Sequence, residues 1–465
     1  MDTKKLRQKI LDLAIHGKLV PQDPNDEPAS VLLERIRAEK EKLIKEGKIK
    51  APKKSKSAGD TSHYPKEVPF EVPEGWCWTT IGDCLINRDG ERIPISSEIR
   101  IKQENKVFDY YGAAGVIDKV DDYLFNERLL LIGEDGANLL SRAKDNAFFA
   151  EGKYWVNNHA HILDATRKPL LDYIALYINS IALDPYITGS AQPKLNQDNL
   201  NRIPVPLPPF MEQLRIIDSM AKSQVIIDII AEKQKEIVNA ISLAKSIILD
   251  LAIHGKLVPQ DPSDEPAIEL LKRINPDFVP SDNLHYGPDV PTKWQLCHIQ
   301  DIASVELGKT LDRLKNSGEE KPYLCALNVK WDAFDLSTVK TICITPSEKE
   351  RYAIQPGDLL VCEGGDVGRS AIWTEDREIY YQNALHRIRF KSNDICPVFF
   401  LYVLRYYKER GIIDDVCKGV TIKHFTGQVF RSIDLPFPPV SEQRRIVKTV
   451  KAYYKILDEI VAGLD

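Results

Sequence analysis

The sequence lacks any run of eighteen apolar residues that could span a membrane, and its amphipathic N-terminus, MDTKKLRQKILDLAI, lacks the apolar block of a secretory signal. Its eight cysteines are scattered without a CxxC pair, which argues against structural zinc and predicts a reducing, cytoplasmic location. An excess of positive charge is also missing, since the formal net charge is −5. Any nucleic-acid binding is therefore expected to be local, or shared with partner subunits.

Complete catalytic motifs are missing as well. EGGDVGRS (363–370) is one residue shorter than a phosphate-binding loop and has arginine in place of its lysine. LPPF (207–210) has leucine where amino-methyltransferases carry an acid or amide. Asp135, Glu151 and Lys153 imitate the acids and lysine of a metal-dependent nuclease, but the corresponding region of the second half has no lysine. These departures favour a chain without a catalytic centre.

The chain does contain an internal repeat. LDLAIHGKLVPQDPNDEPA (11–29) returns as LDLAIHGKLVPQDPSDEPA (249–267), with one difference in 19 positions. Two shorter pairs of segments follow the same order, and EDGA and NNHAHI in the first half resemble EGGD and QNALHRI in the second. Between these anchors the halves differ greatly, so the frame of the repeat is retained while its contents diverge. The shorter pairs are PEGWCWTTIGD (73–83) with PTKWQLCHIQD (291–301), and IPVPLPPFMEQLRII (203–217) with IDLPFPPVSEQRRIV (433–447).

A long helix is predicted after each PPxxEQ segment. The heptad spacing of apolar residues predicts a coiled-coil seam, with Lys233 as a polar interruption, although two core helices of a bundle would give a similar pattern. Residues 211–252 would form a helix of roughly 60 Å. The predicted seam comprises Ile230, Ile237, Ala244 and Leu251, the alternate positions Ile226, Ala240 and Ile247, and in the second copy Ile446, Val450, Tyr453, Leu457, Ile460 and Leu464.

The repeat offsets place Asp465 and Met1 within a few positions of each other on the second long helix. That helix would then be divided, with residues 441–465 as its first half and residues 2–15 as its second. This predicts a circularly arranged pair of repeats whose termini lie close together. The continuous and the divided helix would pack antiparallel, with a globular domain at either end.

Glycine and histidine punctuate the ends of these helices. Gly17 and Gly255 are predicted C-caps, and His16 and His254 just before them would favour the helix dipole. His161 corresponds to His386 in the second half, so a fold-supporting role is the preferred interpretation. His159, two residues earlier in a strand-like pattern, is expected on the same face as His161.

Three pairs of loops contain small, polar and basic residues: 188–197 with 418–427, 87–94 with 307–315, and 134–142 with 363–370. Glycine lets backbone N–H groups approach a phosphate, and amide or basic side chains can bond base edges. For any one loop, an ordinary surface turn explains the composition equally well. The predicted DNA contacts are Arg88, Arg92, Asn138, Arg142, Ser190, Gln192, Lys194, Lys309, Thr310, Arg313, Arg369, Thr421, Lys423 and His424.

LAIHGKLVPQDPNDEPA and the pair VPLPPFMEQLRI and LPFPPVSEQRRI make the chain resemble the specificity subunit of type I restriction–modification systems over essentially its whole length. The resemblance implies an α/β (α+β) fold with two target recognition domains, separated by a long antiparallel two-helix coiled coil. Each domain would read one half of a split DNA sequence, and the helices would set the gap. The expected segments are a conserved helical segment (1–50), a linker (51–72), the first recognition domain (73–208), a central helical region (209–290), the second recognition domain (291–438) and a C-terminal helix (439–465).

The resemblance also implies partners. The family's subunit is not an enzyme: two modification subunits dock on it, bring S-adenosylmethionine and flip out adenine, and restriction subunits add ATP-driven translocation and cleavage. S-adenosylmethionine, ATP and Mg would thus be bound by partners, with no cofactor in this chain. Two alternatives remain, a single-chain nuclease or methyltransferase and a protein adaptor that does not bind DNA.

Overall fold

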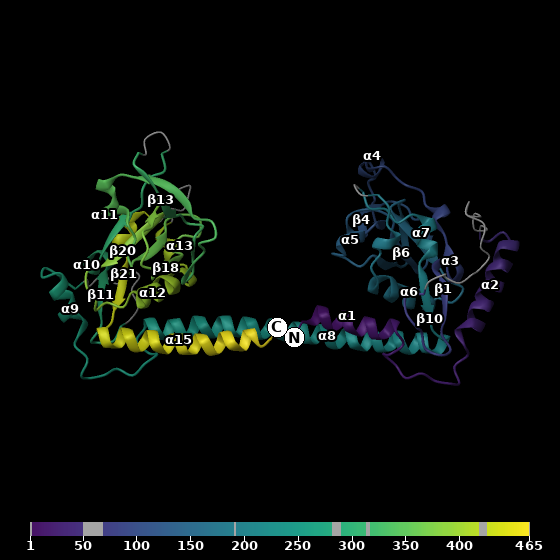
Figure 1. Cartoon of the computed structure of the whole chain (residues 1–465), viewed down its shortest axis with the longest axis horizontal. Coiled ribbons are helices and arrows are strands. Elements are labelled where there is room, and N and C mark those ends of the chain that lie inside the picture. The colour runs from purple at the N-terminus through teal and green to yellow at the C-terminus, as the bar shows by residue number, and fades with distance from the viewer. Residues whose placement is uncertain are drawn as a thin grey trace. The chain divides into compact units, whose positions relative to one another are not determined.

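The computed structural model divides the chain into two compact units, residues 1–233 (unit 1) and 234–465 (unit 2) (Figure 1). Among the described residues, no helix is both long enough and apolar enough to cross a membrane. The structure describes residues 2–49, 68–189, 192–280, 290–312, 317–417 and 426–464.

Unit 1 is built around a four-stranded sheet with the order β2-β9-β6-β7, and a second sheet with the order β4-β3-β8-β5. Its strands are β1 (Cys77–Thr80), β2 (Ile86–Asn87), β3 (Phe108–Gly112), β4 (Gly115–Val120), β5 (Phe125–Asn126), β6 (Leu129–Gly133), β7 (Ala147–Ala150), β8 (Lys153–Val156), β9 (Ala160–Asp164) and β10 (Pro204–Leu207). Its helices are α1 (Thr3–Ile15), α2 (Ala29–Lys45), α3 (Ile81–Cys84), η1 (Asp89–Glu91), α4 (Ser97–Ile101), α5 (Asn138–Ser141), α6 (Pro169–Ser180), η2 (Asp184–Tyr186), α7 (Gln197–Arg202) and the first part of α8 (Phe210–Ile253).

Unit 2 repeats the four-stranded sheet as β12-β20-β17-β18, and adds a three-stranded sheet β16-β13-β19 and the hairpin β14-β15. Its strands are β11 (Gln295–His298), β12 (Ala303–Leu307), β13 (Glu319–Leu324), β14 (Val329–Lys330), β15 (Ala333–Phe334), β16 (Lys340–Ile344), β17 (Leu359–Cys362), β18 (Ser370–Ile372), β19 (Tyr380–Tyr381), β20 (Leu385–Phe390) and β21 (Asp434–Phe437). Its helices, besides the end of α8, are α9 (Ala267–Ile274), α10 (Ile299–Ile302), η3 (Pro346–Glu348), α11 (Lys349–Tyr352), α12 (Pro397–Glu409), α13 (Ile412–Val416), α14 (Gly427–Arg431) and α15 (Val440–Ala462).

The central strand of each four-stranded sheet is buried on both faces, which explains its continuous apolar run. In β6, Leu130 packs into the core formed with the helices, while Leu131 packs into the core beneath the second sheet. In β17, Val361 and Leu360 alternate in the same way. The sheet is therefore a middle layer, with helices on one face and further strands on the other.

The two sheets are equivalent residue by residue at their centre. His161 of β9 lies opposite Ile132 of β6, and His386 of β20 lies opposite Val361 of β17. Both histidines are buried, and each faces the residue two positions before the EDGA or EGGD segment. The predicted fold-supporting position of His161 and its match with His386 are confirmed.

The three long helices agree closely with the predicted ranges, and Figure 1 shows α1 and α15 each lying along a part of α8 within its own unit. In unit 2, Gln234 donates to the carbonyl of Leu464 at 2.6 Å, while Lys245 pairs with Asp458 at 2.5 Å. Rising residue numbers on α8 thus meet falling numbers on α15. These two helices are antiparallel, as the sequence predicted.

The predicted seam on α8 was wrong by one residue at its alternate positions, and Ile237, one of its main positions, is 39% exposed. Ile227 and Ile241 are buried, whereas Ile226 and Ile247 are 58% and 49% exposed. Gln234, and not Lys233, follows the heptad spacing of these buried residues. Because one residue is a turn of about 100°, and α8 carries adjacent pairs of isoleucines, the pattern did not distinguish the two registers. On α15, Tyr453 and Ile460 are likewise exposed.

A repeated polar cluster, which we call the clasp, holds the start of each long helix. In unit 1, Trp76 Nε1 donates to Glu212 Oε2 at 2.9 Å, and Gln22 Nε2 donates to Glu212 Oε1 at 2.7 Å and to the carbonyl of Gly17 at 3.0 Å. Asp26 pairs with Arg215 at 2.5 Å. Backbone and side chains from three distant segments are thereby joined.

Unit 2 contains the same clasp, bond for bond. Glu442 accepts from Trp294 at 2.9 Å and from Gln260 at 2.5 Å, and Asp264 pairs with Arg445 at 2.5 Å. Asn25 and Ser263, the one difference in the duplicated stretch, both donate to the aspartate two residues earlier. The near-identity of the stretch is therefore explained by intrachain contacts that must be made twice.

Glycine is required at the turn of each clasp. Gly17 and Gly255 have φ of +64° and +66°, and an added Cβ would lie 2.4 Å from a Cγ atom of Pro73 or Pro291. The preceding histidines, His16 and His254, bring Nδ1 to 2.8 and 2.7 Å from the carbonyl four residues earlier. The glycines lie one residue past the predicted C-cap position, since His16 is the C-cap of α1 and α8 ends at Ile253. They end the helices with a left-handed backbone, and the close proline adds a second, steric reason for glycine.

Candidate nucleic-acid interface

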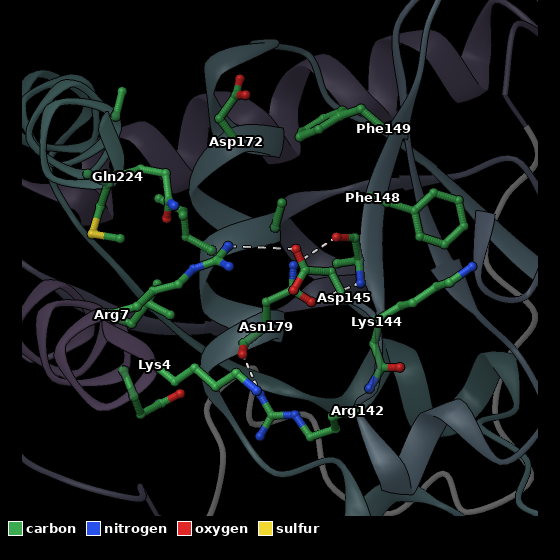
Figure 2. Close-up of a pocket in the computed structure, with 18 of the residues that line it drawn as sticks. Lys4, Arg7, Arg142, Lys144, Asp145, Phe148, Phe149, Asp172, Asn179 and Gln224 are labelled. Carbon is green, nitrogen blue, oxygen red and sulfur yellow. Dashed lines mark hydrogen bonds and ion pairs between the residues drawn. The ribbon is translucent and has the colours of Figure 1, made fainter. Parts of the chain in front are cut away.

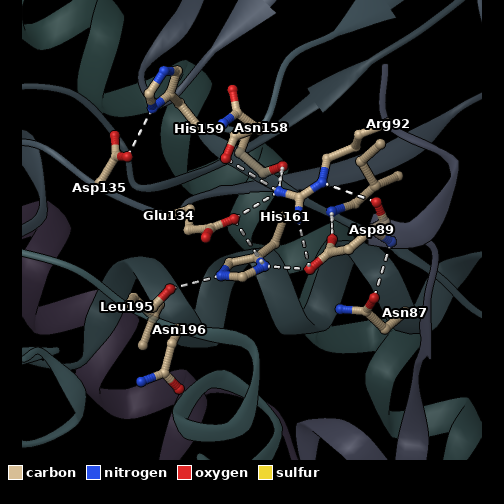
Figure 3. A network of polar contacts seen from close by, with 12 residues as sticks. Asn87, Asp89, Arg92, Glu134, Asp135, Asn158, His159, His161, Leu195 and Asn196 are labelled. Carbon is tan, nitrogen blue, oxygen red and sulfur yellow. Dashed lines mark hydrogen bonds and ion pairs between the residues drawn. The ribbon is translucent and has the colours of Figure 1, made fainter. Parts of the chain in front are cut away.

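Two loops of unit 1 that the sequence singled out, the loop after β6 and the loop before α7, meet the turn before β9 at one end of the four-stranded sheet (Figure 3). Glu134 N–H donates to the carbonyl of His159 at 2.8 Å, and Leu195 N–H donates to the carbonyl of Glu134 at 2.8 Å. Gly136 N–H donates to the carbonyl of Pro193 at 3.1 Å, and Asp135 and Lys194 form a β-bridge. The loop after β6 is therefore tied by backbone bonds to the turn before β9 and to the loop before α7.

A buried network supports these loops from below. His161 Nε2 donates to the carbonyl of Leu195 at 2.7 Å, and its Nδ1 lies 2.6 Å from Asp89 Oδ2. Burial alone would raise the pKa of Asp89, but the hydrogen bond and charge of His161, together with Arg92, hold it below its ordinary value. The carboxylate is thus kept ionised inside the unit, where it fixes the position of β9.

Asp89, Glu134 and His161 together have the spacing of a metal-binding group. The guanidinium of Arg92 already supplies the positive charge, since Nη1 donates to Glu134 Oε2 at 2.6 Å and Nη2 lies 3.5 Å from Asp89 Oδ2. A cation in addition to this guanidinium would meet repulsion in a buried site. The cluster is therefore better described as an ion-pair network than as a metal centre.

His159 differs from the predicted strand position. β9 begins at Ala160, and the preceding residues Asn157–His159 form a turn, so the alternation of a strand does not extend to His159. Its side chain is 48% exposed, whereas that of His161 is 1% exposed. The expectation that both histidines share a face was wrong, because the two-residue period holds only inside a strand.

Three of the predicted DNA contacts in unit 1 are engaged by intrachain partners. Arg88 bonds both oxygens of Glu91 and reaches Glu127 at 2.5 Å. Arg92 is part of the buried network, and Asn138 closes the turn to Lys144 and Asn146. These side chains position the loops in which they lie.

Three other predicted contacts of unit 1 are exposed. Gln192 lies on the surface, Lys194 is 52% exposed while its Nζ lies 3.3 Å from Glu134 Oε1, and Arg142 has a left-handed φ of +50° and donates to the carbonyl of Asn179. Lys194 and Arg92 share Glu134, so the structure brings two of the predicted loops together on one carboxylate. Ser190 lies outside the described residues.

In unit 2, Lys309 is buried and its Nζ lies 2.5 Å from Glu348 Oε2. Arg369 donates to the carbonyl of Ala326 at 2.8 Å, and Thr310 is exposed. The other predicted contacts of this unit, Arg313, Thr421, Lys423 and His424, lie outside the described residues.

The imitated catalytic motifs are not assembled. β6 and β7 pair with Leu129 opposite Ala150, so Glu151 and Asp135 lie at opposite ends of β6, and Glu151 pairs instead with Arg128 at 2.7 Å. EGGDVGRS closes the antiparallel pair β17–β18, with Gly368 N–H donating to the carbonyl of Cys362, and it does not begin a helix as a phosphate-binding loop must. Neither a nuclease centre nor a phosphate-binding loop is formed by these segments.

A cleft of about 980 Å³ lies between α1, the turn after α5, α6 and α8 (Figure 2). Lys4, Arg7, Arg142 and Lys144 give its edge a basic character, and Arg7 lies 3.8 Å from Asp145. All of its walls belong to unit 1. Arg142, one of the exposed predicted contacts, thus lies at this cleft, whose lining also includes Asp145 and Asp172.

Comparison with known proteins gives a consistent result. Residues 73–239 and 291–464 match the model of the type I restriction modification DNA specificity domain. The EcoEI specificity subunit of Escherichia coli is 26% identical over 99% of this chain and 90% of its own length. The EcoAI specificity subunit of Escherichia coli is 32% identical over 58% of this chain and 55% of its own length.

Two solved structures share the fold at low sequence identity. The HsdS subunit of Thermoanaerobacter tengcongensis has a TM-score of 0.50 and 16% identity, covering 86% of this chain and 93% of that one. A chain from a structure describing complex assembly and conformational transition of the type I R-M system has a TM-score of 0.53 and 17% identity, covering 85% and 96%.

Proposed function

This chain belongs to the type I restriction modification DNA specificity family, and we propose that it selects a bipartite DNA target, with unit 1 reading one half and unit 2 the other. Sequence would be read by side chains at base edges, while backbone contacts hold the register. The two halves would differ in sequence because the loops at the sheet edges differ between the units.

One observation carries this proposal: the same clasp occurs twice and holds two different sets of loops. Trp76 with Glu212 and Trp294 with Glu442 are matched in partner atoms and in distance. The EDGA and EGGD segments follow equivalent strands, yet one continues into α5 and the other closes a hairpin. A duplicated frame with divergent loops suits a protein that performs one kind of recognition on two different sequences.

We propose that α8, with α1 and α15 alongside, is a spacer that sets the gap between the two half-sites. A rigid helix is suited to this role, since its length rises by about 1.5 Å per residue and does not depend on the sequence bound. Half-site separation in other two-part DNA readers is likewise set by protein geometry.

The partners would supply the chemistry. Two modification subunits would dock on the two similar frames, bind S-adenosylmethionine and methylate a flipped adenine, while restriction subunits would use ATP and Mg. This chain would contribute no catalytic group. The net charge of −5 fits such sharing, because much of the phosphate contact would come from partners. The complex would act in the cytoplasm.

The test is a comparison of DNA methylation in a host that carries this chain with its modification subunit and in the same host without this chain. We expect adenine methylation at one split motif with unequal halves, lost when this chain is deleted. If the methylated motifs are unchanged, and the purified complex binds random and genomic duplexes equally well, a protein adaptor that does not read DNA becomes the better explanation.

A further inference from the structure

Within the described part of unit 1, the pair of exposed His159 and largely buried Asp135 makes no side-chain hydrogen bond or ion pair with the Asp89–His161 network. Asp135 Oδ2 lies 2.7 Å from His159 Nδ1, and the carboxylate side chain is 15% exposed while the imidazole is 48% exposed. Figure 3 shows the pair to one side of the Asp89–His161 network. Among the described residues, Nε2 of the half-exposed His159 ring makes no hydrogen bond.

The pair is held on a rigid base. His159 N–H donates to Asn157 Oδ1 at 2.8 Å, and the carbonyl of His159 accepts from Glu134 N–H. Asp135 is bridged to Lys194. A side chain fixed in this way loses little conformational entropy on binding, which is the property expected of a preorganised contact residue.

The chemistry of the pair favours a base over a phosphate. When the Asp135 carboxylate accepts the Nδ1 proton of a singly protonated ring, the other ring nitrogen, Nε2, is left as a hydrogen-bond acceptor. A phosphate offers no proton to such an atom and would be repelled by the neighbouring carboxylate. Adenine and cytosine, in contrast, each present an amino group in the major groove that donates to an acceptor.

We propose that His159, oriented by Asp135, is a specificity-determining residue of unit 1 that accepts a hydrogen bond from the exocyclic amino group of an adenine or cytosine in its half of the target. Asp135 is the positioning residue, since it fixes which ring nitrogen carries the proton. This inference rests on the proposed function.

The test uses the full chain with its modification subunits and duplexes in which each position of the target is replaced in turn by the other three bases. His159→Ala should lower discrimination at one adenine or cytosine position of a single half-site by roughly 5- to 30-fold, and leave the other half-site unchanged. Asp135→Asn should reduce discrimination at the same position, because an amide can either accept from or donate to His159 Nδ1 and therefore no longer fixes which ring nitrogen carries the proton. His159→Gln, which retains an acceptor, should keep part of the preference.

Lys119→Ala, an exposed substitution on β4, is the matched control and should leave all positions unchanged. Thermal unfolding of each variant separates local effects from loss of fold. If His159→Ala discriminates at every position as the wild type does, or weakens all duplexes equally, the inference is wrong while the proposed function stands. If the wild-type complex itself shows no split preference, the proposed function fails first.

Discussion

The indole nitrogen of Trp76 donates to a carboxylate oxygen of Glu212 at 2.9 Å, across 136 residues of sequence. The bond joins the segment that enters β1 to the first turn of α8. Both side chains are buried, at 7% and 1% exposure, so water cannot replace the donor. The first three predictions concern this clasp and its copy in unit 2.

Trp76→Phe should destabilise unit 1 by about 1.5–3 kcal/mol, because it removes a hydrogen bond to a buried charged group while leaving most of the ring in place. Trp294→Phe should have a similar effect on unit 2. Urea unfolding followed by far-UV circular dichroism measures both. Trp331→Phe, outside the clasp, is the control, and equal midpoints for all three variants would contradict the prediction.

Gly17→Ala should be more harmful than Gly47→Ala, although both glycines end a helix with positive φ. At Gly47, with φ of +71°, an added Cβ meets no atom within 4 Å, so only the backbone cost of about 1–2 kcal/mol applies. At Gly17 the Cβ would also lie 2.4 Å from Pro73. Denaturant midpoints should rank wild type, then Gly47→Ala, then Gly17→Ala, and an equal effect of the two substitutions would refute the steric argument.

The carboxyl groups of Glu212 and Glu442 should make the free energy of unfolding decrease as the pH rises. Burial raises the pKa of each above its ordinary value, although the indole and amide donors oppose this effect. A carboxyl whose folded pKa is raised contributes stability that is present below the unfolded pKa of about 4.3 and is lost as the pH rises through the folded pKa. The double variant Glu212→Gln, Glu442→Gln should lose this part of the dependence between pH 4 and pH 7. If the free energy of unfolding of the double variant and of the wild type changed with pH in the same way, this prediction would be contradicted.

Arg92→Ala and Gln192→Ala should separate a positioning residue from a contact residue. Arg92 is only 15% exposed, and its loss removes the guanidinium that Glu134 and Asp89 share, which leaves the partly exposed Lys194 and the ring of His161 as their partners, so unit 1 should be destabilised by about 3 kcal/mol. Gln192→Ala should change stability by less than about 0.5 kcal/mol, and lower target affinity roughly 5-fold if the predicted contact is made. The free energy of unfolding and the affinity for target duplex, measured on the same preparations of both variants, test this separation. Equal loss of stability in the two variants would contradict it.

The long helices and the clasp could largely be predicted from the sequence, because the two halves of the chain can be compared with each other. Positions that stay identical in two otherwise different halves, such as Trp76 and Trp294, had to be structural or shared with a partner. Helix periodicity then located α8 to within one residue and α15 to within three residues at each end. The register of the α8 seam was missed, since adjacent isoleucines allow two solutions that differ by one residue.

The recognition loops were harder to interpret because ion pairs join residues that are distant in sequence. Arg88 meets Glu127 and Lys309 meets Glu348, each 39 residues away, and no local pattern indicates these partners. Basic residues in polar loops were therefore predicted as contacts although several hold carboxylates. His159, which we propose as a contact, was absent from the predicted contacts for a different reason: its exposure depends on where β9 begins, and strand ends are poorly determined by propensity.

Each unit also contains a two-stranded antiparallel sheet, β1 with β10 in unit 1 and β11 with β21 in unit 2, and this sheet has a consequence for how such a chain can change. Cys77 lies opposite Leu207, and Gln295 lies opposite Phe437, so the chain enters and leaves each recognition unit through neighbouring strands. The segment between the two strands therefore begins and ends at one fixed strand pair. That segment can be exchanged for another of different length and sequence while the helices and the clasp stay in place. Under the proposed function, one half of the target could thus change while the other half is retained.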